Sequence, residues 1–169
     1  DGMTVVAPLK LGDFFRKRGF SNVVDMDWYD ELVLNELKVT ALPVVHWSGA
    51  VGFEYNSALW AGFAFKGTDR HILIGGVSGY GPVLKESGGR YGPFDTGLLG
   101  IGAYGPREMM HASHATPEEA VQMGLDLGAR RIVGMHWGTV ILTQEPPFEP
   151  PERFLAAGRE AGYDDNDIW

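Results

Sequence analysis

The sequence predicts an α/β protein in which a mixed sheet is covered by helices on one face. Two observations carry this prediction. From about residue 70 onward, strand-like runs alternate with helical patterns, which is typical of layered α/β proteins. Before that point, strand-like runs follow one another closely and are separated by turn residues, which favours hairpins. The length of 169 residues suits a single domain covering 1–169.

Composition narrows the class of protein. The net charge of −8 and the pI near 5.0 argue against a nucleic-acid partner, which would require a basic surface. The chain has no cysteine, so any metal must be held by His, Asp, Glu and water, a donor set that suits zinc or iron in a hydrolytic site. No apolar run approaches the ~20 residues that span a bilayer. We expect a cytoplasmic protein.

The first half of the chain is predicted to contain strands and one short helix. Leu11 to Arg18 places Phe14 and Phe15 on one helical face, and Gly19 stands where a C-cap glycine belongs. Residues 28–31 are predicted as a loop. The predicted strands are Thr4–Ala7, Asn22–Met26, Leu37–Ala41, Leu59–Phe65 and His71–Ile74, with a hairpin turn at 66–70 before the last.

The second half alternates helices with strands. Its clearest signal is a helix from Pro117 to Leu127, with Thr116 as N-cap, Glu119 completing a capping box and Gly128 after its end. The other predicted elements are a helix at Pro82–Ser87, a turn at Gly92–Asp95, a strand at Leu98–Ile101, a loop carrying His111 and His114, a strand at Arg131–Met135 and a last helix opened by Pro150 and Pro151 and ended by Gly162.

Two glycine-containing loops each allow two interpretations. The polar loop Gly49–Asn56 either contacts a substrate or is a long hairpin connection. The loop Gly75–Tyr80 either cradles an anion with its backbone N–H groups or is a tight turn. It lacks the Gly-Lys-Ser/Thr ending of a phosphate-binding P-loop, which favours the turn.

Two His-Trp pairs each follow an apolar run: His46-Trp47 and His136-Trp137. A single histidine of this kind is more often half-buried and satisfied by a backbone group. The repeated pattern favours metal ligands, because ligands gather beyond the carboxyl ends of strands and imidazole is the commonest metal ligand. We therefore expect His46 and His136 to lie close together at one end of the sheet. His71 begins a strand, faces away from that end, and is interpreted as structural.

Several ordered motifs carry a family resemblance. They are Gly79–Pro82, Arg90–Asp95, Ile101–Arg107, His114–Ala120 and His136–Thr139, together with the His46-Trp47 pair and the proline run at 146–151. The set resembles the N-acylphosphatidylethanolamine-hydrolysing phospholipase D family, which has the metallo-β-lactamase fold. The resemblance extends from about Val5 to about Phe154.

The resemblance implies a four-layer αββα sandwich with a two-metal site between its sheets, of which this chain corresponds to the C-terminal half. The implied cofactor is zinc, with iron or manganese as alternatives, and the metals would activate a water for attack on phosphorus. His46 and His136 resemble metal ligands, one for each metal. His114 resembles the catalytic histidine that contacts the substrate phosphate. Tyr104 and Arg107 resemble substrate-binding residues of the site wall.

The chain departs from the family pattern in two ways. The signature His-x-His-x-Asp-His, which supplies most of the ligands, is absent and is expected upstream of Asp1. A bridging aspartate of the family is replaced by Val77, whose side chain cannot ligate a cation. Asp95 is not expected to substitute for it, because it is predicted to cap a turn before the strand at 98.

Two hypotheses follow for the function. The first is that the chain is the C-terminal part of a metal-dependent hydrolase acting on a phosphodiester or related ester, with a small-molecule or phospholipid phosphate ester as substrate. The chain alone would then be inactive and bind metal weakly or not at all. The second is a non-catalytic binding protein or degenerate pseudoenzyme of the same fold. In both, we expect the missing N-terminal half or a second copy of the chain to cover an open apolar sheet face.

Overall fold

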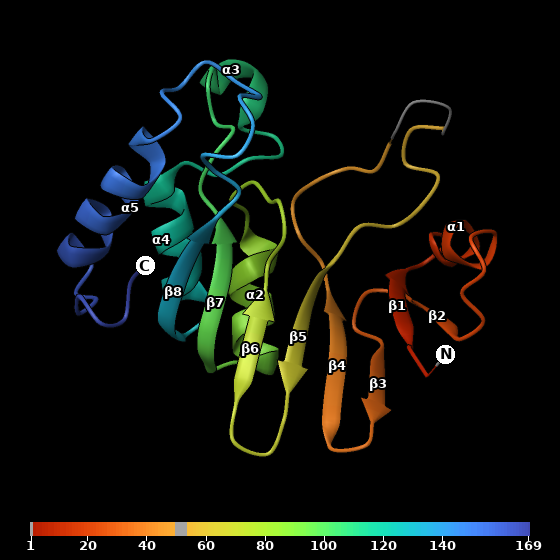
Figure 1. Cartoon of the computed structure of the whole chain (residues 1–169). Coiled ribbons are helices and arrows are strands. Elements are labelled where there is room, and N and C mark those ends of the chain that lie inside the picture. The colour runs from red at the N-terminus through yellow and green to blue at the C-terminus, as the bar shows by residue number, and fades with distance from the viewer. Residues whose placement is uncertain (1, 50–53) are drawn as a thin grey trace.

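The computed structural model describes residues 2–49 and 54–169, so part of the predicted loop at 49–56 lies outside the described residues. Figure 1 shows the arrangement of the helices and strands. The strands are β1 (Val5–Pro8), β2 (Val23–Met26), β3 (Glu31–Leu34), β4 (Leu37–Leu42), β5 (Gly62–Lys66), β6 (His71–Ile74), β7 (Phe94–Gly100) and β8 (Ala129–Met135). The helices are α1 (Gly12–Arg16), α2 (Pro82–Tyr91), α3 (Arg107–Met110), α4 (Pro117–Asp126) and α5 (Glu149–Glu160).

The main sheet has six strands in the order β3-β4-β5-β6-β7-β8. Strands β3 to β6 pair antiparallel, and β6, β7 and β8 pair parallel. The predicted mixed sheet is therefore confirmed, as is the hairpin between β5 and β6. Two antiparallel steps separate β4 from β6, so β4 runs in the same direction as β6, β7 and β8 (Figure 1). The carboxyl ends of these four strands consequently meet at one edge of the sheet.

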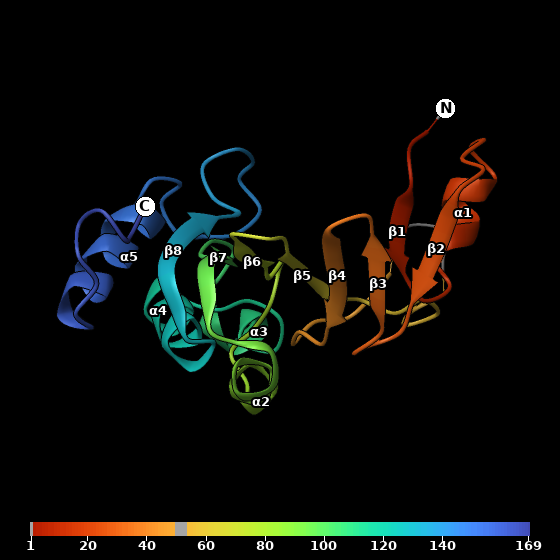
Figure 2. The ribbon, with the colours of Figure 1, turned by 90° about the horizontal axis from the view of Figure 1, so that it is seen from below.

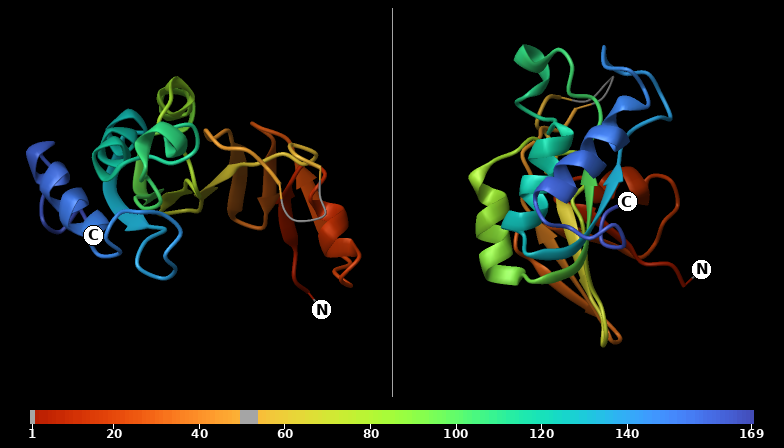
Figure 3. Two further views of the ribbon diagram at one scale, coloured as in Figure 1. Left: turned by 90° about the horizontal axis from the view of Figure 1, so that it is seen from above. Right: turned by 90° about the vertical axis from the view of Figure 1, so that its left-hand side faces the viewer.

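Helices α2 and α4 lie on one face of the main sheet, as Figures 2 and 3 show. This face carries Leu73, Leu99 and Ile132, which belong to the buried core. The opposite face carries Ile74, Leu98 and Val133, which are neighbours in the strand register. In the described part of the chain, no helix covers this second face over β5 to β8 (Figure 2).

Strands β1 and β2 form a separate two-stranded parallel sheet, which lies with α1 beyond the β3 edge (Figures 1 and 2). Two contacts tie this unit to the segment before β5. The indole Nε1 of Trp28 donates to the carbonyl oxygen of Trp60 at 2.6 Å, and the N–H of Leu59 donates to the carbonyl oxygen of Leu9 at 2.9 Å. A two-stranded sheet is marginally stable by itself, so these contacts contribute to its position.

The capped helix predicted from Thr116 is confirmed as α4. The backbone N–H of Glu119 donates to Thr116 Oγ1 at 3.2 Å, and the backbone N–H of Thr116 donates to Glu119 Oε2 at 2.9 Å. Gly128 follows the helix with a φ of 65°, a left-handed conformation that glycine adopts without steric cost. Among the described residues, no helix combines the length and apolar character that crossing a membrane requires.

Several elements predicted from the sequence differ from the structure. The predicted loop at 28–31 runs into β3, because Glu31–Leu34 gains hydrogen bonds by pairing with β4. The turn predicted at 92–95 is shorter, since β7 already begins at Phe94. The other corrections are that α2 continues past Ser87 to Tyr91, that β5 begins at Gly62 instead of Leu59, and that the loop before His111 contains the short helix α3.

Candidate functional site

The carboxyl edge of the main sheet brings three histidines together from distant segments. His46 follows β4, where Val45 forms a bridge to Gly79, and His136 directly follows β8. His114 lies in the turn between α3 and α4. The ring centroid of His114 is 5.5 Å from that of His46 and 5.7 Å from that of His136. We call these three side chains the histidine cluster. It contains all three histidines that the sequence singled out for the site.

The loop after β6 connects the segments that carry two of these histidines. The backbone N–H of Val45 donates to Ser78 Oγ at 3.0 Å, and that of Gly79 donates to the Val45 carbonyl at 2.8 Å. The N–H of Ala115 donates to the Ser78 carbonyl at 2.9 Å. These bonds anchor the neighbours of His46 and His114 on one loop. Since the N–H of Gly79 is engaged, it is not available to an anion, which favours the turn interpretation of this loop.

Val77 lies in the same loop, and Gly100 of β7 is close to both Val77 and His136. A Cβ placed on Gly100 would lie 3.8 Å from the Cβ of His136 and 3.9 Å from the Cα of Val77. The side chain at position 77 is apolar and supplies no metal donor. Asp95 is far from this edge, since its Oδ2 accepts a hydrogen bond from the backbone N–H of His71 at 2.8 Å, at the start of β6.

The backbone of His136 adopts a left-handed conformation with a φ of 65°. This region is uncommon for residues other than glycine, although histidine is enriched in it. Gly102 permits this arrangement, because a Cβ at that position would overlap the carbonyl oxygen of His136. Such strain is retained where surrounding structure enforces it, and it often marks functional sites.

The electrostatic environment of the cluster keeps His114 neutral. Burial, followed by repulsion from His46 and His136, lowers the pKa of His114 to about 4. Its Nδ1 lies 3.0 Å from Ser113 Oγ, and Nδ1 of His46 lies 2.7 Å from the carbonyl oxygen of Trp47. These bonds leave the Nε2 atoms of both rings without a hydrogen-bond partner among the described residues.

Arg107 supports the turn that carries His114. Its Nη1 donates to the carbonyl oxygen of His114 at 2.6 Å, and its Nη2 donates to both carboxylate oxygens of Glu119 at 2.6 Å. The guanidinium thereby connects His114 to Glu119 of the α4 capping box. In the described structure, these bonds direct Arg107 toward protein groups.

Tyr104 follows the end of β7 but directs its hydroxyl toward α5. The hydroxyl donates to Glu149 Oε1 at 2.6 Å, and the guanidinium carbon of Arg153 lies 4.8 Å from the centroid of the tyrosine ring. Burial and the bond to Glu149 raise the pKa of Tyr104, so it remains protonated. The structure therefore engages Tyr104 with Glu149 and Arg153 of α5.

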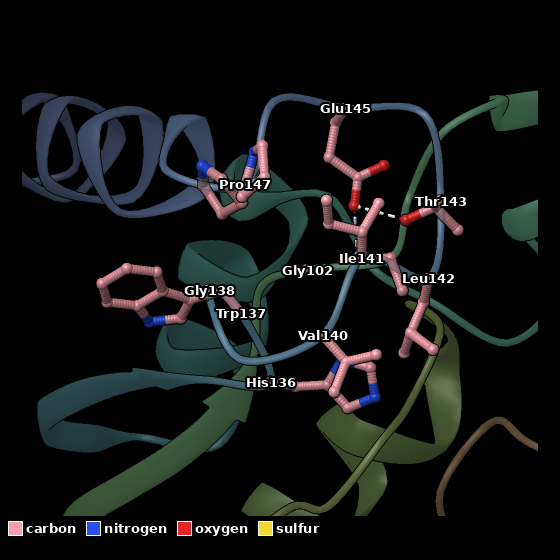
Figure 4. A pocket seen from close by; sticks show the side chains of 12 residues that line it. Gly102, His136, Trp137, Gly138, Val140, Ile141, Leu142, Thr143, Glu145 and Pro147 are labelled. Carbon is pink, nitrogen blue, oxygen red and sulfur yellow. Dashed lines mark hydrogen bonds between the residues drawn. The ribbon is translucent and has the colours of Figure 1, made fainter.

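Glu145 organises the long loop after His136, a role that the sequence analysis did not predict. It accepts hydrogen bonds from the N–H groups of Ala103 at 2.7 Å and Gly105 at 2.9 Å. It also accepts one from the hydroxyl of Thr143 at 2.7 Å (Figure 4). Burial raises its pKa, but these bonds outweigh that effect and the pKa of Glu145 is lowered. No local pattern in the sequence indicates partners some forty residues away.

The same loop forms a pocket beside His136. Figure 4 shows the His136 ring next to Val140, with Ile141 and Leu142 further along the loop. The side chains of Val140, Ile141 and Leu142 are exposed. Three consecutive apolar side chains that are exposed to solvent make the rim of this pocket apolar.

The described residues do not by themselves form a metal centre. The histidine cluster contains donors of the right kind, yet residues 2–49 and 54–169 contain no group of three or more His, Cys, Asp or Glu that could hold a metal ion. Val77 adds no donor. A catalytic zinc site usually has three protein ligands, so the donor set present here is incomplete.

The fold agrees with comparisons to known proteins. A family model described as the beta-lactamase superfamily domain matches residues 3–137. The chain belongs to this family and has a metallo-β-lactamase fold. It is 35% identical, over 86% of its own length, to an N-acyl-phosphatidylethanolamine-hydrolyzing phospholipase D of Caenorhabditis elegans. That alignment covers 44% of the relative, and the chain spans about two fifths of the length of curated relatives that it matches.

Solved structures share the fold at low identity. A metallo hydrolase from Ignicoccus hospitalis aligns with a TM-score of 0.75 and 17% identity, over 99% of this chain and 65% of that one. A diiron β-hydroxylase from Streptomyces venezuelae, CmlA, aligns with a TM-score of 0.71 and 18% identity, over 94% and 37%. This likeness supports the α/β architecture with its mixed sheet and outer helices.

Proposed function

We propose that this chain is the C-terminal part of a metal-dependent hydrolase that acts on a phosphodiester or a related ester, in the manner of a phospholipase D. The single observation that carries the proposal is the histidine cluster, which three segments far apart in the sequence supply at the carboxyl edge of the sheet. The similarity to the phospholipase D of Caenorhabditis elegans supports the same reaction class. A small-molecule or a phospholipid phosphate ester fits the proposal.

In this proposal His46 and His136 are metal ligands, and His114 contacts the substrate. His114 is neutral at pH 7, so it can donate or accept one hydrogen bond toward a phosphoryl oxygen. Arg107 fixes the carbonyl of His114 and so holds this residue in place. The metal, zinc, iron or manganese, requires ligands beyond the described residues, because those present are too few. The 169-residue chain alone is therefore expected to be inactive.

We also propose that another polypeptide covers the open face of the sheet. That face carries Phe63, Phe65, Ile74, Leu98 and Val133 in neighbouring register positions. Two occupants suit it: a further part of the same protein, or a second copy of this chain. An apolar sheet face is stabilised by burial against another layer.

Val77 favours a second candidate function, a non-catalytic binding protein of the same fold. The family resemblance implies a bridging aspartate at this position, and valine supplies no carboxylate that could bind a cation. Such a protein would retain the pocket and bind a phosphate ester without hydrolysing it.

Turnover of bis(4-nitrophenyl) phosphate tests the main proposal. It is measured with zinc, iron(II) or manganese, for the 169-residue chain and for the longest natural polypeptide that contains it. We expect turnover only by the longer protein, and a loss of on the order of a hundredfold or more in its His114→Ala variant. Binding of the ester without turnover would support the non-catalytic alternative. Turnover that His114→Ala leaves unchanged would contradict the proposed site.

Zinc retained after dialysis tests the argument from Val77. Val77→Asp is expected to raise the zinc affinity of the chain by roughly tenfold or more, because it supplies the carboxylate ligand that the family resemblance implies at this position. Val77→Asn is the matched control, since it has the same shape without the charge. One zinc held tightly by the unmodified chain would show that its donor set is larger than the structure indicates.

A further inference from the structure

The Nδ1 atoms of His46 and His114 have different hydrogen-bond partners, a carbonyl oxygen and a hydroxyl. Nδ1 of His46 meets the carbonyl oxygen of Trp47 at 2.7 Å. A carbonyl oxygen can only accept, so Nδ1 of His46 carries the hydrogen and its Nε2 presents a lone pair. Nδ1 of His114 instead meets the hydroxyl of Ser113 at 3.0 Å, and a hydroxyl can either donate or accept.

The burial of Ser113 decides between these two directions. Ser113 is 7% exposed, so its hydroxyl hydrogen must find an acceptor within the protein. Among the described residues, Nδ1 of His114 is the sole hydrogen-bond partner of this hydroxyl. A hydroxyl that accepted from Nδ1 would leave its own hydrogen unpaired in a buried position, which is unfavourable. Ser113 therefore donates, and Nδ1 of His114 accepts.

The surrounding backbone holds Ser113 and His114 in this relation. The N–H groups of Ser113 and His114 both donate to the carbonyl of Met110, at 3.1 and 2.9 Å. Gly79 packs against the same turn, since a Cβ at that position would lie 3.0 Å from the His111 carbonyl oxygen and 3.3 Å from the Ser113 nitrogen. Together with the bond from Arg107 to the His114 carbonyl, these contacts fix where the hydroxyl meets the ring.

We propose that Ser113 is a positioning residue that sets His114 as the Nε2–H tautomer, so that His114 donates a hydrogen bond to an anionic phosphoryl oxygen while His46 presents a lone pair. The assignment of the ligand rests on the proposed function, whereas the assignment of the tautomers rests on the hydrogen bonds alone. The two neighbouring imidazoles thus differ in hydrogen-bonding character. The lone pair on Nε2 of His46 attracts a cation, and the Nε2–H of His114 attracts an anion.

The test is a long-range proton–nitrogen correlation spectrum of the 169-residue chain labelled with ¹⁵N-histidine, recorded at pH 7.5. We expect Nε2–H with an unprotonated Nδ1 for His114, and the opposite tautomer for His46. Ser113→Ala should convert His114 to a mixture of tautomers and shift its Nδ1 resonance. Ser113→Thr, which keeps the hydroxyl, should restore the wild-type spectrum.

Ser87→Ala is the matched control, because it also deletes a buried hydroxyl but lies in α2, in the helix-side core. It should leave the resonances of His114 unchanged. A hydrogen on Nδ1 of His114 in the wild-type chain would overturn the proposal even if the Ser113 variants failed to fold. An unchanged Nδ1 resonance in a folded Ser113→Ala variant would overturn it as well.

Titration with inorganic phosphate tests the proposed ligand separately. Phosphate should shift the Nε2–H signal of His114 in the wild-type chain, and its affinity should fall several-fold in Ser113→Ala. The absence of any shift would overturn the assigned ligand. Neither the tautomer measurement nor the phosphate titration uses turnover. A failure of the hydrolase proposal can therefore be distinguished from a failure of the tautomer assignment.

Discussion

The two faces of the main sheet are made of similar residues but have different surroundings. On β6, Leu73 is 3% exposed on the helix-covered face, whereas the next residue, Ile74, is 39% exposed on the open face. On β7, Leu99 is fully buried and the adjacent Leu98 is only half-buried. A sheet with one solvated face normally alternates apolar with polar residues. The apolar residues on both faces indicate a sheet suited to burial on both sides.

Truncation of a leucine on each face should show the largest difference. Leu99→Ala is expected to lower the free energy of unfolding by about 2–5 kcal/mol, because it leaves a cavity in the core. Leu98→Ala, the same chemical change one residue away, should lower it by less than ~1 kcal/mol, because that side is already open. Urea unfolding of both variants measures the comparison. Equal losses would mean that the open face is as tightly packed as the covered one.

Removal of a buried hydroxyl from the covered face should have a smaller and opposite effect. Ser87 is 1% exposed in α2, and its Oγ has no hydrogen-bond partner within residues 2–49 and 54–169. Ser87→Ala should raise the free energy of unfolding by up to about 1 kcal/mol, because an unpaired buried polar group is lost. Ser48→Ala is the control, since the Ser48 hydroxyl donates to the Ala58 carbonyl and its loss should destabilise the chain. A destabilised Ser87→Ala variant would contradict this account.

The pH dependence of stability should report on His71, which begins β6. Burial is the main cause that lowers the pKa of His71 from its ordinary value of 6.5, with Lys66 and Lys38 acting in the same direction. The Pro93 carbonyl and Asp95 act in the opposite direction. The unfolded chain therefore binds this proton more readily, and the stability present above pH 6.5 is lost as the pH falls through the lower folded pKa.

His71→Gln should make this loss shallower. Urea unfolding of both proteins at pH 7.5, 6.5 and 5.5 measures the change. Some dependence should persist in the variant, since the pKa of His114 is also lowered, to about 4. Identical pH profiles for the two proteins would show that His71 titrates alike in the folded and unfolded chains.

A charge on the open face should change the free energy of unfolding least. Ile74→Lys is expected to alter it by no more than ~0.5 kcal/mol, because the side chain is partly in solvent. The same change should reduce the binding of an apolar dye and the apparent mass in light scattering, because it interrupts the apolar patch. A wild-type chain that is monomeric at high concentration and binds no dye would contradict the proposed covering of this face.

Elements with local signals were the ones that the sequence predicted well. Helix α4 was predictable because Thr116 and Glu119 form a capping box within one turn of the chain. Strand β3 was not predictable in this way, because Glu31–Leu34 is stabilised by its pairing with β4. The start of β7 at Phe94 was hidden for a similar reason: Gly92 and Pro93 indicate a turn, while the pairing of Phe94 with Ala129 lies far along the chain.

The candidate site shows the same division. His46, His114 and His136 could be singled out because two of them follow apolar runs and all three lie in motifs of the resemblance. The hydrogen-bond partners that hold the site could not be predicted from the sequence. Ser113 is adjacent to His114, but its hydrogen bond to the ring depends on the turn between α3 and α4. The contacts of Glu145 with Ala103 and Gly105 join segments about forty residues apart, for which the local sequence has no pattern.

The strand order has a consequence for how the site comes into existence during folding. His46 and His136 follow β4 and β8, and β5, β6 and β7 lie between those two strands in the sheet. The histidine cluster can form only after every intervening strand has paired, including the parallel pairs, which depend on slow, non-local contacts. We therefore expect the cluster to form late in folding. A single cut in the exposed turn at 66–70, between β5 and β6, would separate the two halves of the cluster into different fragments.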